Sequence, residues 1–349
     1  MAARPTGFPS ETDFRIEDAP VAPLKDGQFL VRIIYLSVDP YMRGRMRDAP
    51  SYAPPVPIGG VMTGGAVGEV IESRHPDYQP GDIVGGFFGW QQYAVSDGSE
   101  MVRKIDPALA PISTALYALG MPGMTAYFGM LDIGRPRAGE TVVVSGAAGA
   151  VGSLAGQIAK IQGCRVIGIA GSDEKVDHVI RDCGFDAAFN YKAVSDYQAK
   201  LAELCPDGID VYFDNVGGAI TDAVLMNIAV GARIVLCGQI SQYNLAAPEM
   251  GPRLLFRLVI RQARMEGFLV FRYFDRYAEG IEQMARWIRE GRIRYREQVA
   301  EGIDAAPAAF LGMLRGQNTG KQLVKISEPP PGVQHEDAGR SASRSEAEI

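Results

Sequence analysis

The chain has 349 residues, of which 47% are hydrophobic and 22% charged, and its formal net charge at pH 7 is −6. This length allows two globular domains, and the acidic balance argues against a nucleic-acid partner or an anionic membrane surface. No stretch approaches the ~20 consecutive apolar residues of a membrane span, and the first residues lack the apolar core of a signal peptide, so we expect a cytoplasmic protein with no membrane partner.

Ligands for a metal ion are scarce in this sequence. The cysteines are scattered without a C-x-x-C pair, and the histidines share no spacing that suits a metal. We therefore predict no metal site and interpret the thiols as small core side chains. The residues concerned are Cys164, Cys183, Cys205, Cys237, His75, His178 and His335.

The first third of the chain, residues 7–118, is rich in strand patterns and in turns. Many short strands separated by glycine and proline predict a compact β-barrel, because the prolines leave no room for long helices. The predicted strands cover residues 28–36, 68–72, 82–88 and 90–95.

After Pro111 the pattern changes to helices and then to strands that alternate with helices. Such alternation predicts parallel βαβ units, so we expect an α/β fold with a doubly wound parallel sheet here. Two helices are predicted at residues 112–120 and 124–131, strands at 141–145, 164–170, 187–191, 209–214, 232–238 and 265–270, and intervening helices at 154–161, 174–183, 194–204 and 219–228.

The last part of the chain rejoins the first domain in this interpretation. A helix is predicted over residues 274–288, and residues 321–327 form a strand with no helix after it. Residues 328–349 lack apolar periodicity, so we expect a disordered tail. The predicted domains are residues 1–120 with 305–327 for the barrel, 121–304 for the parallel sheet and 328–349 for the tail.

Four arginines recur at helical spacing beside apolar residues in the segment 253–264. A strip that binds phosphate or RNA is one interpretation of them. The overall acidity and the apolar opposite face favour an amphipathic helix at a domain or subunit boundary instead. The arginines are Arg253, Arg257, Arg261 and Arg264.

The stretch from Thr141 to Ser153 combines a buried strand, a glycine-rich turn and the start of a helix. Gly146, Gly149 and Gly152 permit a tight turn, close approach of a phosphate and close packing of the helix on its strand. The spacing departs from G-x-G-x-x-G, because Ala147 stands where the first glycine should. A plain strand-to-helix turn is the alternative, but the flanking strands and helix favour dinucleotide binding through the helix N-terminus.

The end of the next strand favours NADP(H) over NAD(H). An NAD-binding unit should offer an acid to the ribose about 20 residues after the glycines, whereas this chain has Ala170, Gly171 and Ser172. Ser172, Lys175 and Tyr191 together could hold a 2′-phosphate with one charge and two hydroxyls. Alone, Lys175 would be interpreted as part of a solvated helix face.

Several motifs, taken together with this fingerprint, identify the family that the chain resembles. They are LSVDPYMRGRM at residues 36–46, GMPGMTAY at 120–127, DNVGG at 214–218, CGQISQYN at 237–244, MEGFLV at 265–270 and NTGKQ at 318–322. With these, the chain resembles the zinc-independent, NADP-dependent alkenal double-bond reductases of the medium-chain dehydrogenase/reductase superfamily. The resemblance implies a GroES-like barrel, a Rossmann domain, a homodimer, and reduction of small apolar α,β-unsaturated aldehydes and ketones.

The resemblance also implies roles for individual residues. Gly149, Ala150, Val151 and Gly152 would bind the pyrophosphate, and Lys175 and Tyr191 the 2′-phosphate. Asn215, Cys237, Gly238, Gln239, Ile240, Ser241, Tyr243, Phe268, Leu269, Val270 and Asn318 would line the ribose and nicotinamide, with Met124 and Thr125 beside the nicotinamide. Tyr243 and Tyr52 would flank the substrate. Zinc-dependent relatives need cysteine near residue 38 and Gly-His-Glu near residue 60, where this chain has Val38 and Gly60.

Tyr243 is the residue to which we give a catalytic role. A conjugated C=C bond accepts hydride at its β-carbon, and a hydroxyl suffices to stabilise the enolate oxygen. We expect Tyr243 to donate a hydrogen bond to that oxygen or to orient the nicotinamide, with water as a possible source of the α-proton. Packing alone is the alternative for Tyr243, and more so for Tyr52.

Three classes of function stay open at this point. An enone or enal reductase is favoured. A quinone reductase, or a zinc-independent alcohol dehydrogenase working in the other direction, is a second class. A non-catalytic NADPH-binding protein is the third.

Overall fold

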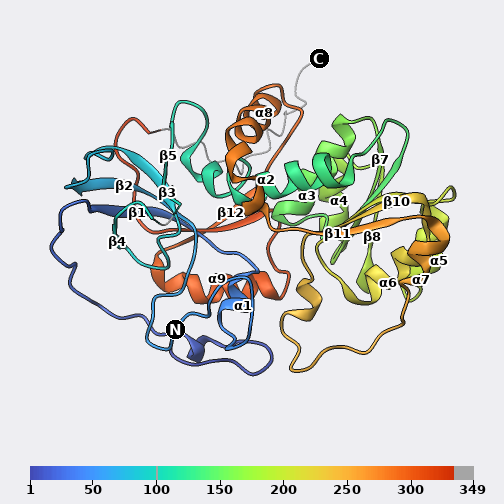
Figure 1. The fold of residues 1–349 in the computed structure, drawn as a ribbon, viewed down its shortest axis with the longest axis horizontal. Coiled ribbons are helices and arrows are strands. Elements are labelled where there is room, and N and C mark those ends of the chain that lie inside the picture. Colours follow the sequence, from blue (N-terminus) through green and yellow to red (C-terminus); the bar gives the residue numbers. More distant parts are fainter. Residues whose placement is uncertain (100, 334–349) are drawn as a thin grey trace, which may run out of the picture.

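The computed structural model describes residues 1–99 and 101–333. Figure 1 shows two parts side by side, each built around its own sheet, with α8 above the junction and α9 below the first part. One sheet has seven strands and the other has six. The predicted tail, residues 328–349, falls from residue 334 onward outside the described residues.

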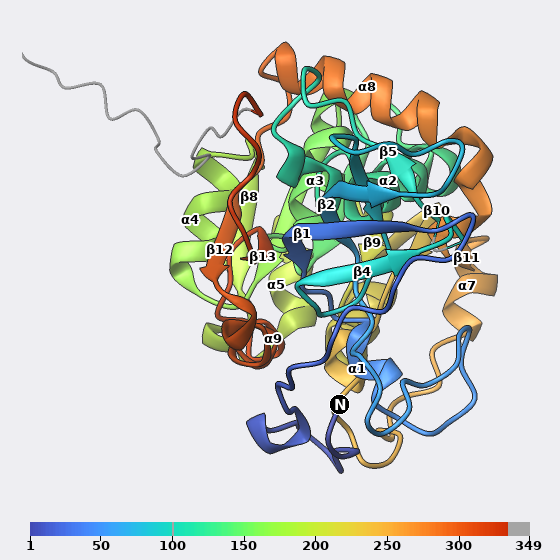
Figure 2. The ribbon, with the colours of Figure 1, turned by 90° about the vertical axis from the view of Figure 1, so that its left-hand side faces the viewer.

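The first sheet contains the strands predicted in the N-terminal region. Its order is β12-β13-β1-β2-β3-β5, and β4 also pairs with β1. Figure 2 shows β1, β2 and β4 facing the viewer, with α1 below them. The strands are β1 (Phe29–Ser37), β2 (Ala66–Ser73), β3 (Ile83–Gly86), β4 (Tyr93–Ser96), β5 (Arg103–Lys104), β12 (Glu297–Glu301) and β13 (Lys321–Lys325).

Two elements of the first part differ from the sequence-based expectation. β12 pairs in parallel with β13 in this sheet, although the predicted boundary assigned residues up to 304 to the other domain. The helix expected at residues 112–120 is only a 3₁₀ turn, Ile112–Leu116. Gly120 ends that segment, since a Cβ there would lie 2.1 Å from the carbonyl oxygen of Ala115.

The second sheet is parallel throughout and follows the order β11-β10-β9-β6-β7-β8. The chain reverses its winding direction between β6 and β9, and ligands of open α/β sheets bind outside the carboxyl ends of the strands at such a point. The strands are β6 (Thr141–Ser145), β7 (Arg165–Ala170), β8 (Ala187–Asn190), β9 (Ile209–Asp214), β10 (Ile228–Leu236) and β11 (Arg264–Gly267).

The helices complete both parts. They are α1 (Met42–Arg45), α2 (Met121–Phe128), α3 (Ala150–Ile161), α4 (Asp173–Arg181), α5 (Tyr197–Leu204), α6 (Gly218–Met226), α7 (Phe256–Arg261), α8 (Tyr277–Arg289) and α9 (Ala306–Leu314). Within residues 1–99 and 101–333, none of them combines the length and the apolar character that a bilayer crossing requires.

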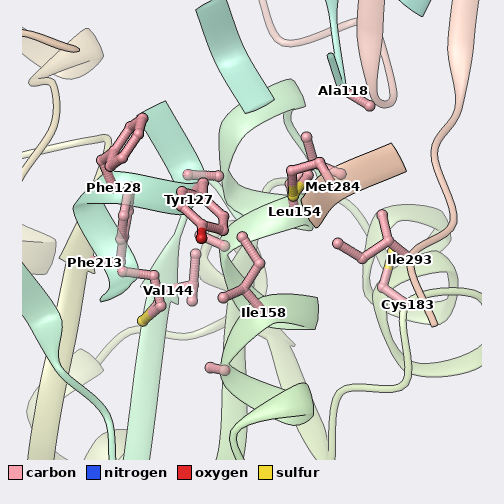
Figure 3. Packing of buried hydrophobic residues seen from close by; sticks show 14 of the residues in the cluster. Ala118, Tyr127, Phe128, Val144, Leu154, Ile158, Cys183, Phe213, Met284 and Ile293 are labelled. Atoms are coloured by element: carbon pink, nitrogen blue, oxygen red, sulfur yellow. The ribbon is translucent and has the colours of Figure 1, made fainter. Parts of the chain in front are cut away.

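The core of the second part lies between the parallel sheet and helices α2, α3 and α8 (Figure 3). Val144 and Phe213 point from the strands toward Leu154 and Ile158 of α3, and all four side chains are fully buried. Met284 brings α8 onto the same cluster. This packing holds the carboxyl ends of β6 and β9 rigidly. The space outside these strand ends, where open α/β sheets bind their ligands, is called the crevice below.

The arginine-rich segment forms a shorter helix than its spacing predicts. α7 has six residues and ends at Gln262, whose φ is +49°, and Arg264 already belongs to β11. Leu258 packs partly buried against the core, but the N-cap residue Leu255 and the helix residues Phe256 and Val259 are 67%, 69% and 68% exposed. The helix therefore leaves a large part of its apolar surface uncovered within the described chain.

Candidate active site

The glycine turn between β6 and α3 is built for close approach of a ligand. Gly146 has φ +60°, and its carbonyl oxygen accepts a hydrogen bond from the N–H of Gly149 at 2.9 Å. A Cβ on Gly152 would lie 2.3 Å from that oxygen, so the first turn of α3 tolerates no side chain there. Gly149 is the N-cap of α3, and the free N–H groups of that helix start suit a phosphate.

A distant segment completes the wall of this turn. Gly320 donates its N–H to the carbonyl oxygen of Ala148 at 2.8 Å, and Gly149 and Gly320 form an isolated parallel bridge. The φ of +71° at Gly320 lets the chain turn beside the carbonyl oxygen of Arg296. The side-chain amide of Asn318 donates to the carbonyl oxygen of Gly320 at 2.9 Å, which holds Asn318 beside this segment.

The three residues predicted for a 2′-phosphate lie together at the end of β7. Ser172 is the N-cap of α4 and accepts from the N–H of Lys175. The ring of Tyr191 lies 3.2 Å from where a Cβ on Gly171 would stand. Burial and the nearby Lys192 lower the pKa of Lys175. Lys192 is a second cation here that the sequence prediction did not include, although it directly follows Tyr191.

Asp214 at the end of β9 fixes the neighbouring candidate residues. Its fully buried carboxylate accepts hydrogen bonds from the hydroxyls of Ser145, Tyr212 and Thr221 at 2.9, 2.8 and 2.6 Å. Asn215 is held in turn, because its side-chain amide donates to the carbonyl oxygen of Ser145 at 2.7 Å. The carboxyl ends of β6 and β9 are thus locked together at Ser145, Asp214 and Asn215.

The segment 237–243 follows the same strand ends. The N–H groups of Cys237 and Gly238 both donate to the carbonyl oxygen of Asp214, at 2.9 and 3.0 Å. Burial raises the pKa of the Cys237 thiol to about 12, so this cysteine is an uncharged packing group. Ile240 and Ser241 donate through their N–H groups to the carbonyl oxygens of Asn215 and Val216, so the segment lies along the crevice.

Tyr243 turns back toward this segment. Its hydroxyl oxygen accepts from the N–H of Gln239 at 3.3 Å and lies 3.1 Å from the position of a Cβ on Gly238. Burial raises the pKa of Tyr243, with further contributions from Cys237 and Tyr52. The phenol therefore stays protonated at neutral pH and keeps its proton available for donation.

A cavity that is open to solvent on one side lies between the two parts of the molecule. The hydroxyl of Tyr41 is buried at its wall and has no hydrogen-bond partner among the described residues. Burial and the neighbouring Asp39 carboxylate raise the pKa of Tyr41 well above its usual value. The cavity is lined by Ser37, Asp39, Tyr41, Gly65, Gly85, Gly86, Phe87, Met101, Arg103, Ala115, Leu116, Gly120, Met121, Pro122, Phe271, Phe274 and Tyr277.

Tyr41 was missed as a site residue by the sequence prediction. The signal was present, because Tyr41 lies within the motif that carries the family resemblance. Tyr52, which the prediction chose, is 53% exposed and does not line the cavity. The guanidinium of Arg45 lies 4.2 Å above the Tyr52 ring, and this contact holds the ring at the rim.

The residues predicted to lie near the nicotinamide differ in how far their side chains are buried. Met124 is fully buried and packs against Gly280 of α8, so its side chain faces the core. Thr125 is half-buried and donates its hydroxyl to the carbonyl oxygen of Met121 at 2.7 Å. Val270 is buried in the core, whereas Leu269 is 43% exposed. Phe268 packs partly buried against the same core.

Helix α1 links the two parts across the crevice. Arg43 is fully buried, and its Nε donates to Oδ1 of Asn244 at 2.9 Å while Nη2 donates to the carbonyl oxygen of Gly7 at 2.6 Å. Arg47 donates to the carbonyl oxygen of Leu245. Burial and the charge of Arg47 lower the pKa of Arg43 to about 10. The segment that carries Tyr243 is therefore tied to the helix that follows Tyr41.

The residues in the crevice do not fit a zinc ion. No group of three His, Cys, Asp or Glu side chains able to hold a metal occurs in the described residues. The Asp39 carboxylate instead accepts from Nζ of Lys321 at 2.7 Å and from the hydroxyl of Ser37.

Comparison with known proteins relates this geometry to reductases. A family model described as N-terminal domain of oxidoreductase matches residues 1–104, and one described as zinc-binding dehydrogenase matches residues 150–287. The NADPH-dependent curcumin reductase of Escherichia coli (strain K12) is 47% identical over 94% of this chain and 96% of its own length. The 2-alkenal reductase (NADP(+)-dependent) of Nicotiana tabacum is 46% identical over 92% and 95%.

A solved structure supports the fold directly. The crystal structure of CurA from Vibrio vulnificus in complex with NADPH superposes with a TM-score of 0.89 at 46% identity, covering 94% of this chain and 98% of the other. The predicted combination of a barrel with a Rossmann sheet is thereby confirmed.

Proposed function

This chain belongs to the NADP-dependent alkenal double-bond reductases of the medium-chain dehydrogenase/reductase superfamily, and we propose that it reduces the C=C bond of α,β-unsaturated aldehydes and ketones with NADPH. The observation that carries the proposal is the cavity between the two parts, whose wall holds the buried, unpartnered hydroxyl of Tyr41. The carbonyl oxygen of an enone or enal, on which negative charge develops, is the acceptor that such a hydroxyl suits.

The cofactor would lie along the carboxyl ends of β6, β7, β9 and β10. Ser172, Lys175 and Tyr191 would hold its 2′-phosphate, and the N–H groups at the start of α3 its pyrophosphate. Bound NADPH would supply a hydride to the β-carbon of the substrate. Asn215, Gly238 and Asn318 would orient the nicotinamide end of the site.

The protein's own part in the chemistry is to stabilise charge on the substrate oxygen. As the β-carbon accepts hydride, the C=C π electrons move toward the carbonyl and negative charge develops on its oxygen. Tyr41 and Tyr243 both stay protonated, because burial raises the pKa of each. Their hydroxyls would donate hydrogen bonds to the enolate oxygen, and water would deliver the proton to the α-carbon.

An absorbance assay at the reduced-nicotinamide band tests the proposal. Purified protein is offered NADPH or NADH with an enal, an enone, a quinone or a saturated ketone in parallel. We expect substrate-dependent loss of NADPH with the enal and the enone, and a saturated carbonyl product by mass spectrometry. Turnover confined to the quinone would point to a quinone reductase, and alcohol formation to a dehydrogenase. Tight NADPH binding with no turnover on the whole panel would indicate a binding protein.

We also propose that the protein is a homodimer and lies in the cytoplasm. Its domains are those predicted from the sequence, except that β12 belongs with the barrel. All four cysteines are free thiols, which suits a reducing compartment. The edge strand β11 directly follows α7, whose side chains Phe256 and Val259 are exposed. A second copy of this chain that continues the sheet beyond β11 would cover both features.

A further inference from the structure

Helix α9 of the barrel ends against the corner that is predicted to hold the 2′-phosphate. Nζ of Lys175, in the first turn of α4, donates a hydrogen bond to the carbonyl oxygen of Gly316 at 2.7 Å, although the two residues are 141 positions apart in the chain. Gly316 directly follows Arg315, which is the C-cap of α9. A lysine of the parallel-sheet part is therefore bound to the end of a barrel helix.

Resting on the proposed function, we propose that the carbonyl oxygen of Gly316 is a positioning group for the cofactor, because it holds the Lys175 ammonium where the 2′-phosphate of NADPH binds. The barrel would then contribute to the choice of NADPH over NADH. The residues proposed to contact the phosphate itself, Ser172, Lys175 and Tyr191, all belong to the parallel-sheet part.

The end of α9 suits an ammonium group. The last carbonyl oxygens of a helix carry partial negative charge, and lysine side chains near a helix C-terminus bind them. Gly316 has φ +70°, and its N–H donates to the carbonyl oxygen of Met313 at 2.9 Å, which fixes the backbone at this residue. Burial and the nearby Lys192 lower the pKa of Lys175, and an acceptor that favours the charged form acts against both.

The bond to Gly316 leaves Lys175 able to bind a phosphate. An ammonium group has three N–H donors, and within residues 1–99 and 101–333 Nζ of Lys175 has no second hydrogen-bond or ion-pair partner. A lysine side chain that is already held in place loses less rotamer freedom on binding than a free one. This preorganisation strengthens the binding of NADPH alone, since NADH carries no 2′-phosphate for the ammonium to contact.

The same segment is tied to the parallel-sheet part at its other end. Gly320 donates its N–H to the carbonyl oxygen of Ala148 at 2.8 Å, beside the glycine turn. Residues 316–320 therefore span the distance from Lys175 to the turn that suits the pyrophosphate. The backbone bond at Gly320 does not involve Lys175, so a change at Gly316 can displace one end of this span while the other end stays in place.

Fluorescence titrations of the purified protein with NADPH and with NADH test the inference. In Gly316→Val, a β-branched side chain does not tolerate the positive φ, so the carbonyl oxygen should move away from Lys175. We expect the Kd for NADPH to rise about three- to tenfold, which is the cost of ordering one free side chain, while the Kd for NADH changes less than twofold.

Gly291→Val is the matched control. Gly291 also follows the C-cap of a helix, α8, and has φ +68°, but no atom lies within 4 Å of the position of its Cβ. This variant should lose similar thermal stability and keep the wild-type ratio of the two Kd values. Gly316→Ala is the milder second variant should Gly316→Val fail to fold. Its Cβ would lie 3.9 Å from Nζ of Lys175, an ordinary contact, and it should shift the ratio less in the same direction.

Lys175→Met shows whether Gly316 acts through Lys175. In this background Gly316→Val should change the ratio no further, and a further fall would overturn the inference. Equal weakening of NADPH and NADH in Gly316→Val, or an unchanged ratio in that variant, would also overturn it. The proposed function would survive these three results. A wild-type protein that binds both cofactors equally would overturn the inference together with the proposed 2′-phosphate site.

Discussion

Arg43 and Asn244 are joined by a 2.9 Å hydrogen bond although they are 201 residues apart in the chain. Arg43 lies two residues after Tyr41, and Asn244 directly follows Tyr243. The bond therefore ties the segment that carries Tyr243 to the helix that follows Tyr41. A hydrogen bond to a fully buried guanidinium is strong enough to hold such a geometry.

Loss of this bond should slow catalysis more than it weakens cofactor binding. For Asn244→Ala we expect kcat with an enone to fall about tenfold, because a hydrogen bond to a charged group is worth ~1.5–3 kcal/mol and positions Tyr243. The KM for NADPH should change little. Asn244→Asp, which keeps an acceptor for Arg43, should restore most of kcat in steady-state assays. Equal losses in both variants would show that the bond does not position the site.

The two buried tyrosines should matter more than the exposed one. We expect Tyr243→Phe and Tyr41→Phe each to lower kcat tenfold or more, with NADPH affinity nearly unchanged, since each removes a donor to the enolate oxygen. Tyr52→Phe should lower kcat less than threefold, because its ring already rests under Arg45 at the rim. Rapid-mixing measurement of hydride transfer checks this order. Wild-type rates in Tyr243→Phe would remove that residue from the mechanism.

Discrimination between the two nicotinamide cofactors should depend on Lys175. In Lys175→Met we expect the KM for NADPH to rise about tenfold or more, while that for NADH changes little, because only NADPH carries the 2′-phosphate. Lys192→Met should have a smaller effect in the same direction, since Lys192 acts on Lys175 through its charge. Parallel titrations with both cofactors check this. A similar rise with NADH would instead indicate a general loss of structure.

The parallel sheet and its glycine turn were largely predictable, because local patterns encode them. The glycine turn and the closeness of Tyr191 to Gly171 both follow from strand ends that meet at one edge of a sheet. The barrel strands were predictable for the same reason, although β12 was not. Its sequence, Glu297 to Glu301, shows little apolar alternation, and only its pairing with β13 defines it.

The substrate side of the site could not be derived in the same way, because it depends on tertiary packing. Tyr41 and Arg103 come from separate elements, and nothing in their local sequence shows that they line one cavity. The role of Met124 stays a prediction. Its motif suggests a cofactor contact, and in the structure its side chain is fully buried and packs against Gly280 of α8.

The proposed homodimer should depend on the exposed face of α7. We expect Val259→Glu to shift the protein to a monomer in size-exclusion chromatography with light scattering, because it places a charge in the contact that would cover this face. Val299→Glu is the control, since Val299 is 42% exposed on β12 in the other part of the molecule. A dimer that persists in Val259→Glu would place the interface elsewhere.

Glu297 should make the folded protein less stable as the pH rises. One oxygen of its carboxyl group is buried without a partner among the described residues, and burial raises its pKa from the usual 4.5 to about 7, although Ser113 and Lys321 act against this. Between these two pKa values the folded state holds a proton that the unfolded state has released. The stability that protonated Glu297 contributes is therefore complete below about pH 4.5 and is lost as the pH rises through about 7. In Glu297→Gln this decline in Tm between pH 5 and pH 8 should become shallower, and the variant should be more stable than wild type at pH 8. Glu301→Gln, an exposed position in the same strand, should keep the wild-type slope in thermal denaturation. Identical slopes in wild type and Glu297→Gln would mean that other groups govern the pH dependence.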